Sequence, residues 1–144
     1  MSYNVGVIGY GWAAQAHIDA INGTEQGNVV AVYSSRPLDN AELSKAHGGE
    51  VRGFSSVDEM LACDDIDVVS ITSYPKQHRE QAVAAANAGK HIILEKPMAL
   101  TWEDCSAIYE AVKANGVKAT VCFEIRHISQ FLTTTSMIDD GMIG

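Results

Sequence analysis

Basic residues are scarce in this sequence of 144 residues. Ten lysines and arginines stand against 18 aspartates and glutamates, which gives a formal net charge of −8 at pH 7. Binding to nucleic acid or to an anionic membrane surface needs a basic face, so neither is predicted as a partner. Long apolar runs are also missing, since none approaches the ~20 residues that cross a bilayer. No signal peptide is expected before the first predicted strand, which begins at Tyr3. We therefore expect a cytoplasmic protein.

Cysteine is equally rare. The three cysteines, Cys63, Cys105 and Cys122, are odd in number, widely spaced and set in apolar surroundings. This pattern indicates reduced, buried thiols rather than a disulfide framework. No pair of cysteines or histidines has the spacing of zinc ligands, so no metal site is predicted.

Strand-like and helix-like segments alternate along the whole chain. The composition, 47% apolar and 19% charged, fits one globular domain with its own core. The predicted strands are residues 3–8, 28–34, 51–54, 66–72, 91–94 and 118–123. The predicted helices are residues 11–22, 38–47, a brief one around 60–61, 75–88, 102–115 and 128–140. Apolar strands alternating with helices predict an α/β fold, a doubly wound parallel sheet covered on both faces.

A glycine-rich turn, Gly9 to Ala14, follows the first strand. Gly9 permits a tight turn, and Gly11 removes the side chain that would block an approaching pyrophosphate. The helix that follows directs its unpaired amides at the same anion, with Trp12 and Ala13 in its first turn. The turn predicts a Rossmann fold that binds a dinucleotide, although an ordinary strand–turn–helix can also contain such glycines.

The end of the second strand bears on the choice of cofactor. An acidic residue there would hold the ribose 2′-hydroxyl of NAD, but the sequence has Ser34, Ser35 and Arg36. Hydroxyls and a guanidinium favour a 2′-phosphate, so NADP is favoured over NAD. Two readings stay open: Arg36 points into solvent, or Asp39 reaches back to the ribose.

The fifth strand runs directly into Glu95-Lys96-Pro97. This places a lysine at the carboxyl edge of the sheet, where such folds bind their ligands. Its ammonium is suited to bind a substrate oxygen and to stabilise negative charge that develops there. Pro97 fixes the backbone at that exit, and a cis peptide before it is an option. Taken alone, the tripeptide is also compatible with a solvated strand end.

Together these residues resemble the glucose–fructose oxidoreductase and inositol dehydrogenase family, written Gfo/Idh/MocA. Its members carry the glycine turn, then Thr-x-x-Pro-x-x-His, then Ala-Gly-Lys-His-x-x-x-Glu-Lys-Pro, and an arginine after a further strand. In this sequence the later motifs are Thr72 to His78, Ala88 to Pro97, and Arg126. The resemblance covers essentially the whole chain.

The resemblance implies an NAD(P)-dependent oxidoreductase that transfers a hydride to or from a sugar, a polyol or a related hydroxyl or carbonyl compound. Lys96 would be the active-site lysine, touching substrate and nicotinamide, with Glu95 beside it. The other residues implied to line the cofactor come from the glycine turn and from the carboxyl ends of the later strands. They are Gly9, Gly11, Trp12, Ala13, Ser34, Ser35, Arg36, Thr72, Ser73, Pro75, His78, Pro97 and Arg126.

A division of the chain also follows from the resemblance. Residues 1–124 would form the dinucleotide-binding domain, and residues 125–144 would begin the crossover into a C-terminal substrate domain absent from this sequence. In the family that domain supplies substrate contacts, an Asp and His pair and the oligomer interface. We therefore expect cofactor binding without complete catalytic machinery, and the formation of a homo-oligomer stays open.

Other functions compete with this interpretation. A non-catalytic nucleotide-binding or partner-binding module would use exposed apolar side chains such as Phe131, Leu132, Met137 and Ile138. A methyltransferase shares the glycine-rich first turn but gives no reason for Glu-Lys-Pro. The tyrosine and lysine at 109 and 113 imitate the pair of short-chain dehydrogenases only by chance, because they fall within an amphipathic helix.

The histidines outside the motifs receive no catalytic role. His17 and His47 are interpreted as surface or packing residues, and His91 as a structural residue of the fifth strand. His127 follows Arg126 and is left unassigned.

Overall fold

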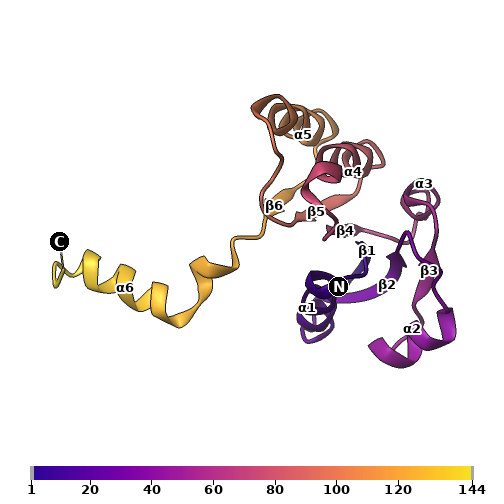
Figure 1. Cartoon of the computed structure of the whole chain (residues 1–144), viewed down its shortest axis with the longest axis horizontal. Helices are drawn as coiled ribbons and strands as arrows, with labels where there is room; N and C mark the ends of the chain where they lie inside the picture. Colours follow the sequence, from indigo (N-terminus) through magenta and orange to yellow (C-terminus); the bar gives the residue numbers. More distant parts are fainter. Residues whose placement is uncertain (1, 144) are drawn as a thin grey trace.

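The computed structural model describes residues 2–143, which form a six-stranded parallel sheet with helices on both faces (Figure 1). The strands are β1 (Tyr3–Ile8), β2 (Gly27–Tyr33), β3 (Arg52–Phe54), β4 (Val68–Ile71), β5 (His91–Leu94) and β6 (Ala119–Val121). The helices are α1 (Trp12–Asn22), α2 (Asn40–His47), α3 (Val57–Leu61), α4 (Pro75–Asn87), α5 (Trp102–Asn115) and α6 (Ser129–Asp139), with a 3₁₀ turn η1 (Glu124–His127) before α6. The predicted α/β doubly wound sheet is confirmed.

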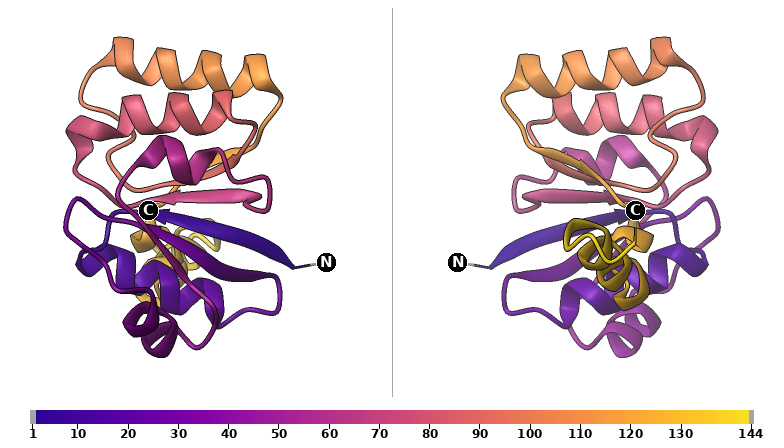
Figure 2. Two further views of the ribbon diagram at one scale, coloured as in Figure 1. Left: turned by 90° about the vertical axis from the view of Figure 1, so that its right-hand side faces the viewer. Right: turned by 90° about the vertical axis from the view of Figure 1, so that its left-hand side faces the viewer.

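Each face of the sheet carries its own apolar layer. Successive side chains of a strand point to opposite faces, so Val5 and Val7 of β1 pack with α1 and α2, whereas Ile8 packs with α3, α4 and α5. Figure 2 shows the result as three layers, with α4 and α5 on one side of the sheet and α1 and α2 on the other. Burial of both faces explains why the strands have few polar residues.

The strand order β3-β2-β1-β4-β5-β6 places a change of direction at β1. The sheet grows from β1 through β2 and β3 to one edge, and from β4 through β5 and β6 to the other. The connections that leave β1 and β4 therefore lie on opposite faces, which opens a crevice at the carboxyl ends of these two strands. The turn at Gly9 and the segment after Thr72 meet at this crevice.

The element boundaries follow local capping. Helix α2 begins at Asn40 and not at Leu38, because the Asp39 carboxylate accepts hydrogen bonds from the amides of Ala41 and Glu42. Strand β6 is shorter than predicted because this edge strand pairs with β5 through three residues only.

Helix α6 lies away from the sheet, at the yellow end of the chain in Figure 1. It is present where a helix was predicted, but none of its residues is buried. The apolar side chains of Phe131, Leu132 and Ile138 are each about half exposed. Among residues 2–143, no helix combines the length and the apolar character that a membrane crossing requires.

Candidate functional site

The turn after β1 is shaped by two glycines with different constraints. Gly9 has a φ of +104°, and a Cβ on it would lie 3.0 Å from Thr72 Oγ1 and 3.1 Å from the Thr72 carbonyl carbon. Only glycine fits this position without strain. Gly11 is the N-cap of α1 with an extended backbone, and a Cβ on it would meet no heavy atom within 4 Å. The backbone conformation therefore requires glycine at position 9, whereas at position 11 a side chain would fit the fold and glycine leaves that space open.

This open space fits a diphosphate. No side chain caps the N-terminus of α1, so its first amides are available to an anion. Trp12, which follows Gly11, is 89% exposed and leaves the helix terminus uncovered. A single groove joins this turn to the ends of β2 and β4. Its lining is Gly9, Tyr10, Gly11, Trp12, Ala13, Tyr33, Ser34, Ser35, Arg36, Thr72, Ser73, Tyr74 and Gln77.

The end of β2 presents a guanidinium to one end of the groove. Arg36 donates a hydrogen bond through its side chain to the Tyr10 carbonyl over 3.0 Å, and its amide donates to Ser34 Oγ over 3.0 Å. The Asp39 carboxylate is occupied as the cap of α2. Arg36 is therefore bonded to the glycine turn while it remains exposed to solvent, and one oxygen of Asp39 is engaged at the helix N-terminus.

The end of β4 forms the opposite wall. Thr72 binds the Ile8 carbonyl through its amide, over 2.9 Å, and through its hydroxyl, over 3.1 Å, which joins β4 to the glycine turn. The Ser73 hydroxyl donates to Gln81 of α4. Pro75 occupies the first turn of α4, where its missing N–H costs no hydrogen bond.

His78 lies behind this wall rather than on it. Its side chain has no exposed surface, with Nδ1 2.8 Å from the Pro97 carbonyl oxygen and Nε2 3.1 Å from the Ser73 carbonyl oxygen. The ring thus lies between the loop after β4 and the loop after β5, and a neutral imidazole, with its single N–H, donates to one of the two carbonyls at a time. Any influence of His78 on a ligand in the groove passes through these two backbone segments.

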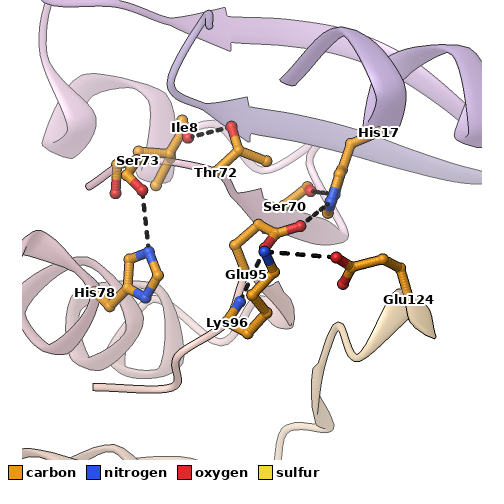
Figure 3. Close-up of polar contacts among 9 residues, drawn as sticks. All are labelled: Ile8, His17, Ser70, Thr72, Ser73, His78, Glu95, Lys96 and Glu124. Atoms are coloured by element: carbon orange, nitrogen blue, oxygen red, sulfur yellow. Dashed lines mark hydrogen bonds and ion pairs between the residues drawn. The ribbon is translucent and has the colours of Figure 1, made fainter. Parts of the chain in front are cut away.

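Lys96 lies at the carboxyl end of β5, next to a cis peptide bond between Lys96 and Pro97. Its Nζ is 3.5 Å from Glu124 Oε1, and these two side chains are 49% and 58% exposed. Figure 3 shows the ammonium between the β5 loop and η1. Arg126, also on η1, lines the same apolar groove as Lys96 and Pro97, so the structure brings these three predicted residues together.

Glu95 is held by a residue that the sequence reasoning missed. His17 Nε2 lies 3.0 Å from Glu95 Oε1, and His17 Nδ1 lies 2.8 Å from Ser70 Oγ (Figure 3). The expected packing role of His17 thus understates its position, because the ring reaches the loop that carries Lys96. Helical spacing contained the signal, since His17 follows one turn after Ala13 on the face of α1 that packs on the sheet.

The groove beside Lys96 carries negative charge. It is lined by α1, the end of β5, Cys122 and Glu124. Burial, followed by the carboxylates of Glu95 and Glu124, raises the pKa of the Cys122 thiol above its ordinary value. Among the described residues, no group of three His, Cys, Asp or Glu side chains is placed to hold a metal ion.

A parallel sheet with a glycine turn, an open helix N-terminus and a groove across the switch point defines a dinucleotide-binding Rossmann domain. Residues 3–123 match the oxidoreductase family with an NAD-binding Rossmann fold, Gfo/Idh/MocA, and the chain belongs to this family.

Three relatives illustrate the range of the match. The chain is 34% identical to inositol 2-dehydrogenase of Klebsiella pneumoniae, with all of this chain and 43% of that protein covered. Apo scyllo-inositol dehydrogenase of Lactobacillus casei superposes with a TM-score of 0.87 at 29% identity, covering 99% of this chain and 43% of that one. Biliverdin reductase of Synechocystis, solved with biliverdin and NADP+, gives a TM-score of 0.74 at 29% identity, covering 82% and 37%. The chain thus spans about 40% of the length of these relatives.

Proposed function

We propose that the chain is the cofactor-binding part of an oxidoreductase that transfers a hydride to or from a hydroxyl or carbonyl carbon of a sugar or polyol. The observation that carries the proposal is that the groove at Gly11 and the groove at Lys96 adjoin at the carboxyl edge of one sheet, where both are lined by Trp12 and Ala13. Two relatives are named as inositol dehydrogenases, which supports a polyol substrate.

The proposed role of each residue follows from its position at the carboxyl edge of the sheet. The amides of the glycine turn and of Trp12 and Ala13 would hold the diphosphate, and Thr72 and Ser73 would form the wall on the nicotinamide side, with Pro75 at the start of the helix behind it. The bound nicotinamide supplies the site that accepts or donates the hydride. Lys96 donates a hydrogen bond to the reacting oxygen of the substrate and stabilises the negative charge that gathers there.

The cofactor is NADP in preference to NAD. Arg36 lines the groove at the end of β2, with Ser34 and Ser35 next to it, and one oxygen of Asp39 caps α2. A guanidinium with adjacent hydroxyls suits a 2′-phosphate. The Synechocystis biliverdin reductase, solved with NADP+, supports the same preference.

Turnover by this chain alone is expected to be absent or very slow. Lys96 is one group, and general acid–base chemistry requires a second group within hydrogen-bond reach of the substrate oxygen. We place the cofactor domain at residues 1–124 and a crossover at 125–144. We also propose a cytoplasmic location, consistent with three unpaired cysteines, and a homo-oligomer of the complete enzyme.

A titration tests the proposal directly. The nicotinamide fluorescence of NADPH should rise or shift to shorter wavelength as the chain is added, and NADH should bind more weakly. An unchanged spectrum at millimolar cofactor would contradict the proposal.

A second candidate is a non-catalytic nucleotide-binding or partner-binding module. The observation in its favour is the exposure of Phe131, Leu132 and Ile138 on α6, a helix with no buried residue. The two functions differ in the role of Lys96. In an oxidoreductase, Lys96 lies beside the bound nicotinamide, so NADPH should shift the NMR signals of Lys96. In a non-catalytic module, NADPH or a partner should bind without shifting them.

A further inference from the structure

A chain of hydrogen bonds links helix α1 to the backbone of Lys96. His17 of α1 contacts Ser70 Oγ over 2.8 Å and Glu95 Oε1 over 3.0 Å. The second oxygen of the Glu95 carboxylate, Oε2, accepts the amide N–H of Lys96 over 3.0 Å. The side chains of His17 and Glu95 are 14% and 17% exposed, so water competes weakly for these bonds.

The direction of each bond follows from the chemistry of the groups. An ionised carboxylate only accepts hydrogen bonds, so Nε2 of His17 must carry a proton and donate to Glu95. When the ring is neutral, Nδ1 is then an acceptor and the Ser70 hydroxyl donates to it; when the ring is protonated, Nδ1 donates to Ser70. In both cases His17 donates to Glu95, and both oxygens of Glu95 are used.

This Ser–His–Glu arrangement is not a hydrolytic triad. Ser70 lies within β4 and has no exposed surface, so its hydroxyl cannot reach a substrate carbonyl. The exposed end of the hydrogen-bond chain is Lys96. The arrangement therefore acts on the position of Lys96 and not through a nucleophile.

We propose that His17 is a positioning residue for Lys96, an inference that rests on the proposed function of that lysine. The imidazole holds the Glu95 carboxylate at one oxygen, and the carboxylate holds the Lys96 peptide at the other. The N-terminus of the same helix is the site for the diphosphate. One helix thus fixes the separation between the phosphate-binding turn and the backbone of Lys96, from which the reactive ammonium extends, and hydride transfer requires this kind of geometric precision.

A pair of amide variants isolates the bond to Glu95. In His17→Gln the side-chain amide nitrogen occupies the place of Nε2 and still donates to Glu95. In His17→Asn the shorter side chain retains only the position of Nδ1, next to Ser70. The solvent-exchange rate of the Lys96 amide, measured by NMR, should stay near the wild-type value in His17→Gln. It should rise about tenfold in His17→Asn, because the carboxylate that accepts this N–H loses its anchor.

The control is His91→Gln at the opposite end of β5. His91 accepts the Lys118 amide N–H through Nδ1 over 3.1 Å and makes no hydrogen bond to Glu95 or Lys96. This variant should leave the Lys96 amide unchanged. Equal exchange in all variants, or equal acceleration in both His17 variants, would refute the positioning role.

The wild-type protein gives a second measurement that does not depend on the folding of a variant. The ring nitrogen shifts of His17 should show a protonated Nε2 and an unprotonated Nδ1. The opposite tautomer would overturn the proposal. An NADPH titration tests the proposed function separately from the positioning role of His17. If NADPH does not shift the NMR signals of Lys96, the proposed function is contradicted. The exchange rates of the Lys96 amide still decide the role of His17 in that case.

Discussion

The ammonium of Lys96 and the carboxylate of Glu124 face each other over 3.5 Å, between the end of β5 and the 3₁₀ turn that follows β6. Both side chains are about half exposed, so solvent screens their attraction. The contact is therefore weak enough for a ligand oxygen to replace the carboxylate.

This weakness is measurable. Glu124→Gln should change the free energy of unfolding by less than about 1 kcal/mol, since exposed ion pairs contribute about 0–1 kcal/mol. Urea denaturation of both proteins checks the value. A loss of several kcal/mol would show that the pair is part of the structural framework and does not yield to a ligand.

The two glycines of the turn should respond differently to alanine. Gly9→Ala should destabilise the fold by roughly 1–3 kcal/mol, because it combines a positive φ with contacts near 3.0 Å to Thr72. Gly11→Ala should leave stability within about 0.5 kcal/mol, because the new methyl group meets open space. The same methyl group would enter the diphosphate site, so the Kd for NADPH should rise at least about tenfold. Thermal denaturation and a fluorescence titration separate the effects. Full NADPH affinity in Gly11→Ala would place the diphosphate elsewhere.

Arg36→Ala should weaken NADPH binding by roughly 10- to 100-fold, the range expected for one charge-assisted contact, and leave NADH binding nearly unchanged. The matched control is Arg52→Ala. Arg52 pairs with Asp65 over 2.7 Å and does not line the cofactor groove, so its loss should alter neither affinity. An equal loss for NADPH and NADH would contradict a 2′-phosphate contact.

The pH dependence of Cys122 alkylation should be sensitive to the negative charge of Glu95 and Glu124 beside Lys96. Because burial, Glu95 and Glu124 raise the pKa of this thiol, its reaction with iodoacetamide should begin at a higher pH than that of a free cysteine. Glu124→Gln removes one carboxylate and should move the profile back toward lower pH. The raised pKa of Cys122 also makes the free energy of unfolding depend on pH. The folded protein retains the Cys122 proton above the pH at which the unfolded chain releases it, so this group lowers stability as the pH rises through that interval. Mass spectrometry of each cysteine peptide gives the extent of alkylation at each pH. A Cys122 profile equal to that of a free cysteine would contradict the raised pKa.

The fold was predictable because its signals are local. The glycine turn, the apolar strands and helix-ending residues such as Gly48 and Gly116 each act on their own neighbours in the chain. The contacts of His17 with Glu95 and of Lys96 with Glu124 were not predictable, because they join segments whose spacing depends on the packed sheet. The prediction of NADP from Arg36 used sequence position alone, and it stays a prediction.

His78 has a consequence for the interpretation of mutants. One imidazole with no exposed surface lies between the loop after β4 and the loop after β5, so its replacement would loosen both loops at once. If these loops hold the cofactor and Lys96 as proposed, a variant at this position would lose cofactor affinity and the placement of Lys96 together.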